Sequence, residues 1–222
     1  MKDVYISTYT GKRFYPFDPQ IDHVDIIDIA HSLSNINRWI GYTNRPYNVA
    51  EHSIHVAWLI KEQGGNTRDQ LWGLLHDASE AYFGDIASPI KHSFSELVKF
   101  EHNIQQVIAK KFNLPWPMPE IVHRADKKSL LIEANNLFLV RPKWAPEISD
   151  KLLSISDPYT EYLKYFTLLS GVSIGPADTE CGIVDRANGT AENQRSADPG
   201  MMGRPTMPDI RPDTGRNAEK RL

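Results

Sequence analysis

Four side chains that can bind a metal or move a proton lie within ten positions of one stretch, LLHDASEAYFGDIASPIK at residues 74–91. They are His76, Asp77, Glu80 and Asp85. In an α-helix, Glu80 would share one edge with His76, four residues before it, and with Asp77, three before it. Imidazole and carboxylate ligands suit a divalent transition metal, whereas structural zinc sites commonly use cysteine. The stretch therefore predicts part of a metal site whose other ligands come from other helices.

Two residues elsewhere in the chain are candidates to complete this site. His52 lies in the segment VAEHS and Asp126 in the segment HRAD, each within an expected helix. With His76 and Asp77 they would supply two imidazoles and two carboxylates. Such a set leaves positions open for water and substrate, as in catalytic metal sites. Because a divalent metal lowers the pKa of a bound water towards about 7, phosphoester hydrolysis is the natural use of the site.

These residues lie in segments whose apolar side chains recur with helical spacing. Asn48 can cap one helix, which Gly64 would end, and Thr67 can cap the next, which Gly84 would break. No segment alternates as a strand does, so the sequence predicts an all-α body. The expected helices cover residues 25–36, 49–63, 68–83, 95–112, 119–139 and 157–169.

The two ends of the chain differ from this helical body. Residues 1–20 are rich in aromatic residues, Gly and Pro, which predicts a short extended segment or hairpin packed on the body. From about residue 175 the sequence has no aromatic residue and few aliphatic ones. It cannot bury enough apolar area to offset its ordering entropy. We therefore expect one domain over residues 1–174 and a disordered tail over residues 175–222.

Composition narrows the class of protein further. The 222 residues suit one domain, and the net charge of -3 shows no basic footprint for nucleic acid. The single cysteine, Cys181, cannot form an intramolecular disulfide, which fits a reducing compartment. No apolar run approaches the roughly 18 residues that span a membrane. We expect a cytoplasmic protein, in the host cytoplasm if a phage encodes it, that binds neither membrane nor nucleic acid.

The set His52, His76, Asp77 and Asp126 resembles the H…HD…D pattern of the HD-domain metal-dependent phosphohydrolases, an all-α superfamily. The surrounding segments resemble, in order, the blocks of its 5'-deoxynucleotidase-like branch: DIAHSLSNINRWIGYT, YNVAEHSIHVAWL, LLHDASEAYFGDIASPIK and RADKKSLLIEA. They also resemble the phage dATP triphosphohydrolases, which clear dATP in phages whose DNA carries 2-aminoadenine. The resemblance covers about residues 25–135. It implies an HD-domain helical bundle over residues 1–174.

The resemblance also implies roles for the polar residues. The four residues of the pattern would hold a divalent metal, Zn, Co or Mn. Glu80 and Asp85 would be catalytic, either orienting the attacking water or holding additional divalent ions. The residues themselves allow these roles, because carboxylates beside a metal and a polyphosphate can accept a proton or bind a second cation. They also allow a plainer reading, in which Glu80 is a solvated helix acid and Asp85 forms a turn after Gly84.

A substrate site is predicted beside the metal ligands. Arg38 and Lys91 are the expected phosphate contacts, since a guanidinium or ammonium group pairs with phosphate oxygens. Trp39, Ile40 and Pro89 would form the base pocket, where an indole can stack on a base. The Arg38–Trp39 pair also resembles the 5'-deoxynucleotidase-like branch. Alternatively, Trp39 and Ile40 are core residues that end the first helix.

The predicted function is hydrolysis of a deoxynucleoside triphosphate, dATP first, to deoxyadenosine and triphosphate. The alternative uses the same site on deoxynucleoside 5'-monophosphates and releases orthophosphate. The two differ in whether cations are present for two more phosphates; Lys91, Lys127 and Lys128, or ions on Glu80 and Asp85, could supply them.

Two alternatives belong to other classes. A non-catalytic nucleotide-sensing module conflicts with the open ligand set and the two acids. A nucleic-acid binder would need a basic stripe with interleaved aromatic residues. Family members commonly self-associate, so a homo-oligomer is expected. The remaining histidines are expected to be surface or hydrogen-bonded core residues: His23, His31, His55, His92, His102 and His123.

Overall fold

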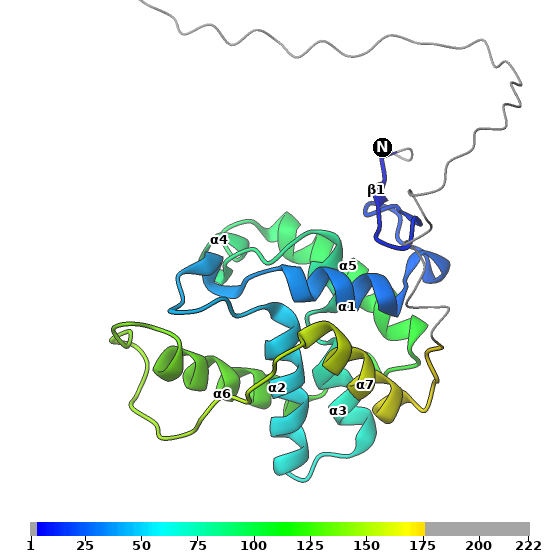
Figure 1. The fold of residues 1–222 in the computed structure, drawn as a ribbon. Coiled ribbons are helices and arrows are strands. Elements are labelled where there is room, and N and C mark those ends of the chain that lie inside the picture. The colour runs from blue at the N-terminus through cyan, green and yellow to red at the C-terminus, as the bar shows by residue number, and fades with distance from the viewer. Residues whose placement is uncertain (1–3, 176–222) are drawn as a thin grey trace, which may run out of the picture. The chain divides into compact units, whose positions relative to one another are not determined.

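The computed structural model describes residues 4–175. Within this range the chain forms seven α-helices, three 3-10 helices and one two-stranded hairpin (Figure 1). The all-α prediction is therefore confirmed. The predicted disordered tail, from residue 176 onward, lies outside the described residues. Among residues 4–175, no helix has the length and apolar character needed to cross a bilayer.

The helices lie close to the ranges expected from the sequence. The α-helices are α1 (Ile26–Asn35), α2 (Val49–Glu62), α3 (Thr67–Leu75), α4 (Ser88–Lys91), α5 (Ser95–Lys111), α6 (Glu120–Asn136) and α7 (Pro158–Ser170). The strands are β1 (Ile6–Ser7) and β2 (Arg13–Phe14), and the 3-10 helices are η1 (Ile21–His23), η2 (Arg38–Gly41) and η3 (Ala78–Tyr82). The sequence did not predict the short α4.

The N-terminal hairpin is held to the bundle by one buried acid and one buried ring. β1 and β2 pair antiparallel, with Ile6 opposite Phe14. Asp28 of α1 accepts hydrogen bonds from Thr10 N at 2.7 Å and Thr10 Oγ1 at 2.9 Å. The buried ring of Phe14 stacks on Tyr82, with their centroids 3.8 Å apart. These contacts confirm the predicted ordered, extended lead-in.

Helix α2 is the buried centre of the bundle, between α6 on one side and α3 with α7 on the other (Figure 1). A reciprocal cap fixes its start: Asn48 Oδ1 accepts from Glu51 N at 2.9 Å, and the Glu51 carboxylate accepts from Asn48 N at 3.2 Å. Gly64, with φ +79°, ends it as predicted. A Cβ on Gly73 of α3 would lie 2.4 Å from Ile60 Cδ1. This close packing fixes the spacing of α2 and α3.

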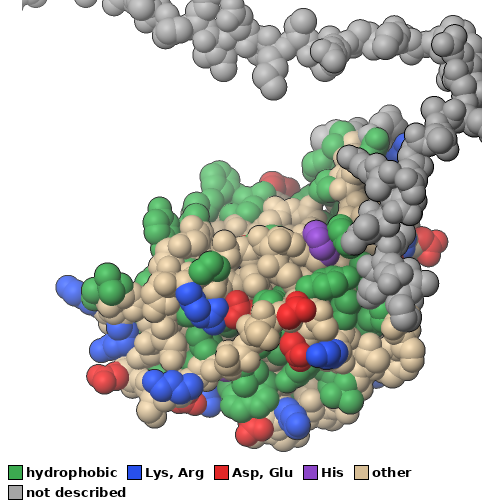
Figure 2. Space-filling model, in the orientation of Figure 1, with side chains coloured by type: hydrophobic (Ala, Val, Ile, Leu, Met, Phe, Trp, Pro, Cys, Tyr) green, Lys and Arg blue, Asp and Glu red, His purple; other side chains and the backbone are tan. Residues whose placement is uncertain are grey.

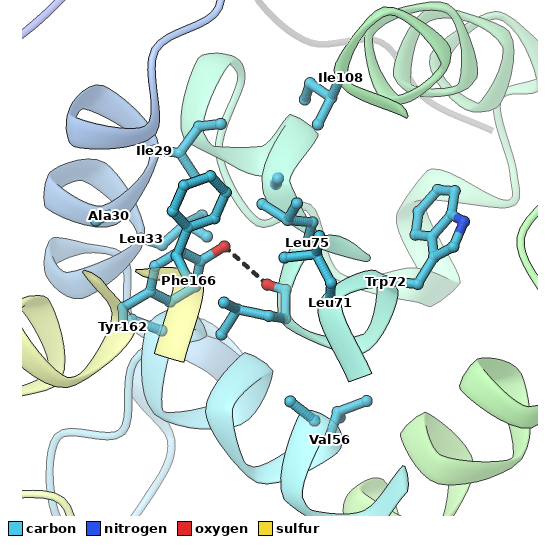
Figure 3. Packing of buried hydrophobic residues seen from close by; sticks show 14 of the residues in the cluster. Ile29, Ala30, Leu33, Val56, Leu71, Trp72, Leu75, Ile108, Tyr162 and Phe166 are labelled. Carbon is cyan, nitrogen blue, oxygen red and sulfur yellow. Dashed lines mark hydrogen bonds between the residues drawn. The ribbon is translucent and has the colours of Figure 1, made fainter. Parts of the chain in front are cut away.

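The apolar core joins α1, α3 and α7 (Figure 3). Leu33, Leu75 and Phe166 belong to one cluster of buried side chains. Each fully buried side chain of this size stabilises the fold by roughly 1.5–3 kcal/mol. The Tyr162 hydroxyl, which lies in this region, donates to Leu74 O at 2.7 Å and so is not left unpaired (Figure 3). The core thus fixes the position of α3, the helix that directly precedes His76.

One predicted helix, over residues 68–83, is divided in the structure. Helix α3 stops before His76, and the chain continues as the 3-10 helix η3. Asp77 adopts φ −104° and ψ 15° between them, while the His76 ring bonds Gly73 O at 2.8 Å. In a 3-10 helix residues three apart eclipse, so Asp77 and Glu80 share a face. The expected pairing of His76 with Glu80 along one α-helix was wrong.

Two helix ends also differ from the expected positions. Asn66, not Thr67, caps α3, because Asn66 Oδ1 accepts from Arg68 N at 2.9 Å. Thr67 is the first residue inside the helix. Helix α6 ends at Asn136, three residues before the expected end, and its last turn is closed by the Asn136 side chain, which donates to the carbonyl of Ile132 at 2.7 Å.

Candidate active site

The four predicted metal ligands converge where α2, α6 and the α3–η3 junction meet. The Nε2 atoms of His52 and His76 lie 3.1 Å apart. Asp77 Oδ2 lies 3.5 Å from His52 Nε2 and 3.2 Å from His76 Nε2. Asp126 Oδ1 lies 3.2 Å and 3.8 Å from the same two nitrogens. One donor atom each from His52, His76 and Asp126 lies within 4.8 Å of the others, so this group could hold a metal ion.

The orientation of both imidazoles fits a metal. His76 Nδ1 lies 2.8 Å from Gly73 O, and because a carbonyl only accepts, Nδ1 carries the hydrogen. His52 Nδ1 lies 2.5 Å from the Glu133 carboxylate, which fixes it in the same way. In the neutral rings, both Nε2 lone pairs then point into the cluster beside two carboxylates. Metal-ligating histidines are typically anchored through the other nitrogen in this manner.

The electrostatics of the cluster lead to the same conclusion. Burial lowers the pKa of His76, but Asp77 and Asp126 outweigh burial and hold that pKa well above its ordinary value. Burial alone would raise the pKa of Asp77 and of Asp126, yet the two histidines hold both below the ordinary range. Imidazole protons and a divalent cation are alternative partners for the same carboxylates. Metal binding here is therefore expected to release protons.

Arg38 lies against this cluster at the start of η2. Its Nη1 is 3.3 Å from Asp77 Oδ2, and its Nε is 3.2 Å from Glu133 Oε2. Burial lowers the Arg38 pKa, but Glu133 and Asp77 more than restore it, so the group stays charged. The neighbouring Trp39 donates from Nε1 to the same Glu133 oxygen at 2.8 Å. Its ring lies near Trp144, with centroids 6.3 Å apart.

The backbone of η2 is strained at two residues that line the cavity described below. Trp39 has φ 58° and Ile40 φ 53°, both in the left-handed region, and Gly41 follows with φ 76°. Left-handed φ is unfavourable for any side chain with a Cβ and is rare for a β-branched one. Ile40 is nevertheless 64% exposed, so the alternative that it is a core residue was wrong. Strain of this kind concentrates at functional sites.

Glu80 and Asp85 lie beside the cluster. Glu80 is only 3% exposed, so the alternative of a solvated helix acid was wrong. Its Oε2 has no hydrogen-bond partner among the residues that the structure describes. Burial raises the Glu80 pKa well above its ordinary value, and Asp77 and Asp85 raise it further. Burial also raises the Asp85 pKa. Two partly desolvated acids thus face the same space, and Asp85 also follows the turn at Gly84, whose φ is +87°.

A cavity of about 770 Å³ collects ten of the eleven predicted site residues along its wall. The exception is His52, which is fully buried. The volume lies within the roughly 300–1,000 Å³ typical of small-molecule sites. The substrate contacts predicted from the sequence are all in this wall: Arg38, Trp39, Ile40, Pro89 and Lys91.

The charge of the cavity wall is mostly negative. Its acids are Asp77, Glu80, Asp85, Glu101 and Asp126. Its Lys and Arg side chains are Arg38 and Lys91, and both are ion-paired. Lys91 Nζ lies 2.8 Å from Glu101 Oε1, a partner that the sequence did not indicate. A phosphate entering this cavity must therefore bind metal ions that the carboxylates hold, or the side chains of Arg38 and Lys91 after these leave their carboxylate partners.

Two lysines proposed for additional phosphates are placed elsewhere. Lys127 and Lys128 are exposed on α6 and do not line the cavity. Lys128 pairs instead with Asp150 at 3.1 Å. On the face drawn in Figure 2, the coloured Lys and Arg side chains are interspersed with Asp and Glu and form no continuous basic stripe.

Sequence reasoning missed several residues of the site. His92, His102 and His123, expected to be surface or hydrogen-bonded core residues, line the cavity. Glu133 was not identified, although it follows Asp126 by seven residues and so lies on the same face of α6. Arg38 and His52 lower the pKa of this buried acid to about 2 against the effect of burial, which raises it. A buried acid at helical spacing from a ligand was the available signal.

The chain is similar to several known proteins. Residues 26–130 match the family described as 5'-deoxynucleotidase YfbR-like. The chain is 33% identical over 171 residues to the uncharacterized protein YfdR of Escherichia coli K12. The aligned region is 77% of this chain and 90% of YfdR. It is 33% identical over 139 residues to an uncharacterized protein of Rhodobacter capsulatus, 60% of this chain and 71% of that protein. A 5'-deoxynucleotidase YfbR of Escherichia coli is 37% identical over 91 residues, 36% of this chain and 46% of that enzyme.

Proposed function

Because the chain belongs to the YfbR-like 5'-deoxynucleotidase family and is a metal-dependent phosphohydrolase, we propose that it hydrolyses the 5' phosphoester of a deoxynucleotide. One observation carries this proposal. Two imidazoles and two carboxylates converge at the wall of a cavity that the acids Glu80 and Asp85 and the guanidinium of Arg38 also line. Membership of this family of enzymes argues against the alternative of a non-catalytic nucleotide-sensing module.

Four residues would hold the metal, which we propose to be Zn, Co or Mn: His52, His76, Asp77 and Asp126. When bound, the metal supplies positive charge that lowers the pKa of water and stabilises charge on phosphate oxygens. The protein's own part is orientation. Glu133 and the Gly73 carbonyl fix the ring hydrogens on Nδ1, which leaves each Nε2 as the ligand atom.

Glu80 and Asp85 would manage protons and cations on the phosphate side. A water oxygen attacks the α-phosphorus, the bond from phosphorus to the 5' oxygen breaks, and a proton must reach that oxygen. Since the pKa of Glu80 is well above its ordinary value, this side chain can take the proton from water and return it to the leaving oxygen. Asp85, beside it, would bind a further divalent ion together with Glu80 when the substrate carries several phosphates.

Arg38 would contact the phosphate, and Trp39, Ile40 and Pro89 the base. The Arg38 guanidinium is already oriented by Asp77 and Glu133, so little conformational freedom is lost when a phosphate arrives. Lys91 would be the second cationic contact, on release from Glu101. The exposed Ile40 offers apolar area at the cavity wall.

We propose dATP as the substrate, with deoxyadenosine and triphosphate as products. The wall of the cavity, whose volume is about 770 Å³, also includes Lys91, His92 and His102, which supports room for more than one phosphate. The alternative is a deoxynucleoside 5'-monophosphate. It is supported by the named activity of the YfbR relatives and by the ion pairs that already occupy Arg38 and Lys91.

Product identification separates these substrates. The purified chain is incubated with Mn²⁺, Co²⁺ or Zn²⁺ and each deoxynucleoside tri- or monophosphate, and products are resolved by ion-exchange chromatography. Triphosphate with nucleoside supports the dATP proposal, while orthophosphate from monophosphates alone replaces it with the nucleotidase. Asp77→Ala is the matched control. Unchanged turnover in this variant would remove the metal assignment.

A further inference from the structure

Glu133 is a fully buried carboxylate beside the candidate metal cluster, and each of its oxygens has its own donors. Oε1 lies 2.5 Å from His52 Nδ1 and 3.0 Å from Ser129 Oγ. Oε2 accepts from Arg38 Nε at 3.2 Å and from Trp39 Nε1 at 2.8 Å. One oxygen therefore contacts a candidate metal ligand, while the other contacts the residues proposed to bind the nucleotide.

We propose that Glu133 is a positioning residue that couples the metal half of the site to the nucleotide half. Through Oε1 it aims the His52 ring, and through Oε2 it holds the guanidinium of Arg38 and the indole of Trp39 at the cavity wall. The nucleotide half of this role rests on the proposed function. The metal half stands on the geometry of the cluster alone.

The metal half follows from imidazole chemistry. A carboxylate that accepts the Nδ1 hydrogen fixes the tautomer, orients Nε2 and makes that nitrogen a stronger ligand. His76 is anchored by the uncharged Gly73 carbonyl, whereas His52 is anchored by a charged oxygen. Loss of the Glu133 charge is therefore expected to weaken His52 as a ligand and leave His76 unchanged.

The nucleotide half follows from the strained backbone of η2. Trp39 and Ile40 both occupy the left-handed region, which the local sequence does not favour. A surrounding structure must over-determine such a conformation for it to persist. The two hydrogen bonds to Glu133 Oε2, from the Arg38 and Trp39 side chains, are charged or charge-assisted and supply that restraint. Glu133 thus determines the orientation of the Arg38 guanidinium and the Trp39 indole at the cavity wall.

A glutamine cannot replace Glu133 in both halves. Its amide has one acceptor oxygen and one NH₂ group, which only donates. If the oxygen faces His52, the NH₂ group meets the donors of Arg38 and Trp39; if it is turned over, the NH₂ group meets the His52 donor. Either way a buried donor is left unsatisfied, and the negative charge is lost.

The first test measures Co²⁺ binding by calorimetry, on the full chain stripped of metal and without nucleotide. Glu133→Gln should lower Co²⁺ affinity by about 10–100-fold, the usual effect of losing such a partner. Trp39→Phe is the matched control, because it removes a donor to Oε2 only, and its Co²⁺ affinity should stay within about twofold of the parent. A Glu133→Gln affinity equal to that of the parent overturns the metal half.

The second test is a double-mutant cycle on the KM for the nucleotide that the parent hydrolyses. Trp39→Phe should raise KM by less in Glu133→Gln than in the parent, because the glutamine either loses the acceptor that faces Trp39 Nε1 or keeps it without the negative charge. Additive effects overturn the coupling and leave Glu133 a merely structural residue. If the parent hydrolyses neither dATP nor dAMP, the proposed function fails, while the Co²⁺ comparison still decides the metal half.

A third variant keeps the proposal testable if Glu133→Gln does not fold. Ser129→Ala removes one donor to Oε1 and leaves Oε2 intact. It should weaken Co²⁺ binding by a few fold and leave KM unchanged, the opposite pattern to Trp39→Phe. If Ser129→Ala and Trp39→Phe both change Co²⁺ affinity, or both change KM, then Oε1 and Oε2 of Glu133 do not have the separate roles proposed.

Discussion

At the scale of single residues, the environment of Glu80 decides its chemistry. It is nearly fully buried, and its pKa is raised by burial and by two neighbouring acids. A raised pKa makes the carboxylate a stronger base than an exposed glutamate, which suits it to accept a proton from water. Glu80 is therefore suited to proton transfer, whereas the pKa values of the two carboxylates proposed to hold the metal, Asp77 and Asp126, are shifted downward.

Replacing Glu80 by Gln should lower kcat by roughly 100-fold or more, because general acid–base catalysis by one side chain is worth about that factor. Co²⁺ affinity measured by calorimetry should stay close to the parent, since the four proposed ligands are intact. Asp85→Asn is the matched comparison at the neighbouring acid. Parental turnover in Glu80→Gln would contradict the proposed proton transfer.

His55, which is not one of the proposed metal ligands, predicts a pH dependence of stability. It is 1% exposed on α2, and burial lowers its pKa to about 4. Between pH 4 and its ordinary value of about 6.5 the unfolded chain binds more protons than the folded chain. Its contribution to stability is thus complete above about pH 6.5 and is lost as pH falls towards 4.

Urea unfolding at pH 7 and pH 4.5 measures this effect. The metal-stripped parent should lose roughly 1–3 kcal/mol more than His55→Gln between the two pH values. The variant shares every other titrating group, so the difference isolates His55. An equal loss in both chains would mean that His55 is not held neutral in the fold.

At the scale of elements, η2 combines backbone strain with exposed apolar area. Ile40→Gly should raise the free energy of unfolding by up to about 1 kcal/mol, because glycine accepts a left-handed φ without penalty. Its KM should rise, since the variant loses the proposed base contact. Urea unfolding and initial-rate kinetics measure the two effects.

Gly41→Ala is the control for this element. Gly41 has φ +76° and nothing within 4 Å of an added Cβ, so alanine would add backbone strain alone. It should lower the free energy of unfolding by about 1 kcal/mol. If Ile40→Gly destabilises the chain as much as Gly41→Ala does, then Ile40 stabilises the fold by packing and the strain account is wrong.

The division of the predicted helix over residues 68–83 shows where local pattern stops being informative. Periodicity continues through this segment, and nothing in it marks a helix end before Gly84. The break comes from a side chain, because the His76 ring takes the Gly73 carbonyl. The orientation of His76, whose Nε2 must face the metal cluster, thus outweighs the helical preference of residues 68–83.

At the scale of the whole molecule, the fold was predictable because helix caps, glycines and apolar spacing are local signals. The four-residue cluster was predictable because an adjacent His-Asp pair with two distant partners is a specific pattern. The cavity histidines and the acid partners of Arg38 and Lys91 were not, because tertiary packing alone brings them together. The same limit applies to Lys127 and Lys128, which the sequence offered as possible phosphate contacts and which do not line the cavity. The predicted homo-oligomer stays a prediction.

The most direct test of the central claim is hydrolysis in ¹⁸O-labelled water by the metal-stripped chain, with and without added Mn²⁺. For dATP or dAMP, we predict metal-dependent release of unlabelled deoxyadenosine. The phosphate product, triphosphate or orthophosphate, should carry one ¹⁸O atom, which mass spectrometry detects. Label in the deoxyadenosine hydroxyl, release of dAMP with pyrophosphate from dATP, or turnover that does not need the metal would contradict metal-dependent hydrolysis of the bond between the α-phosphorus and the 5' oxygen.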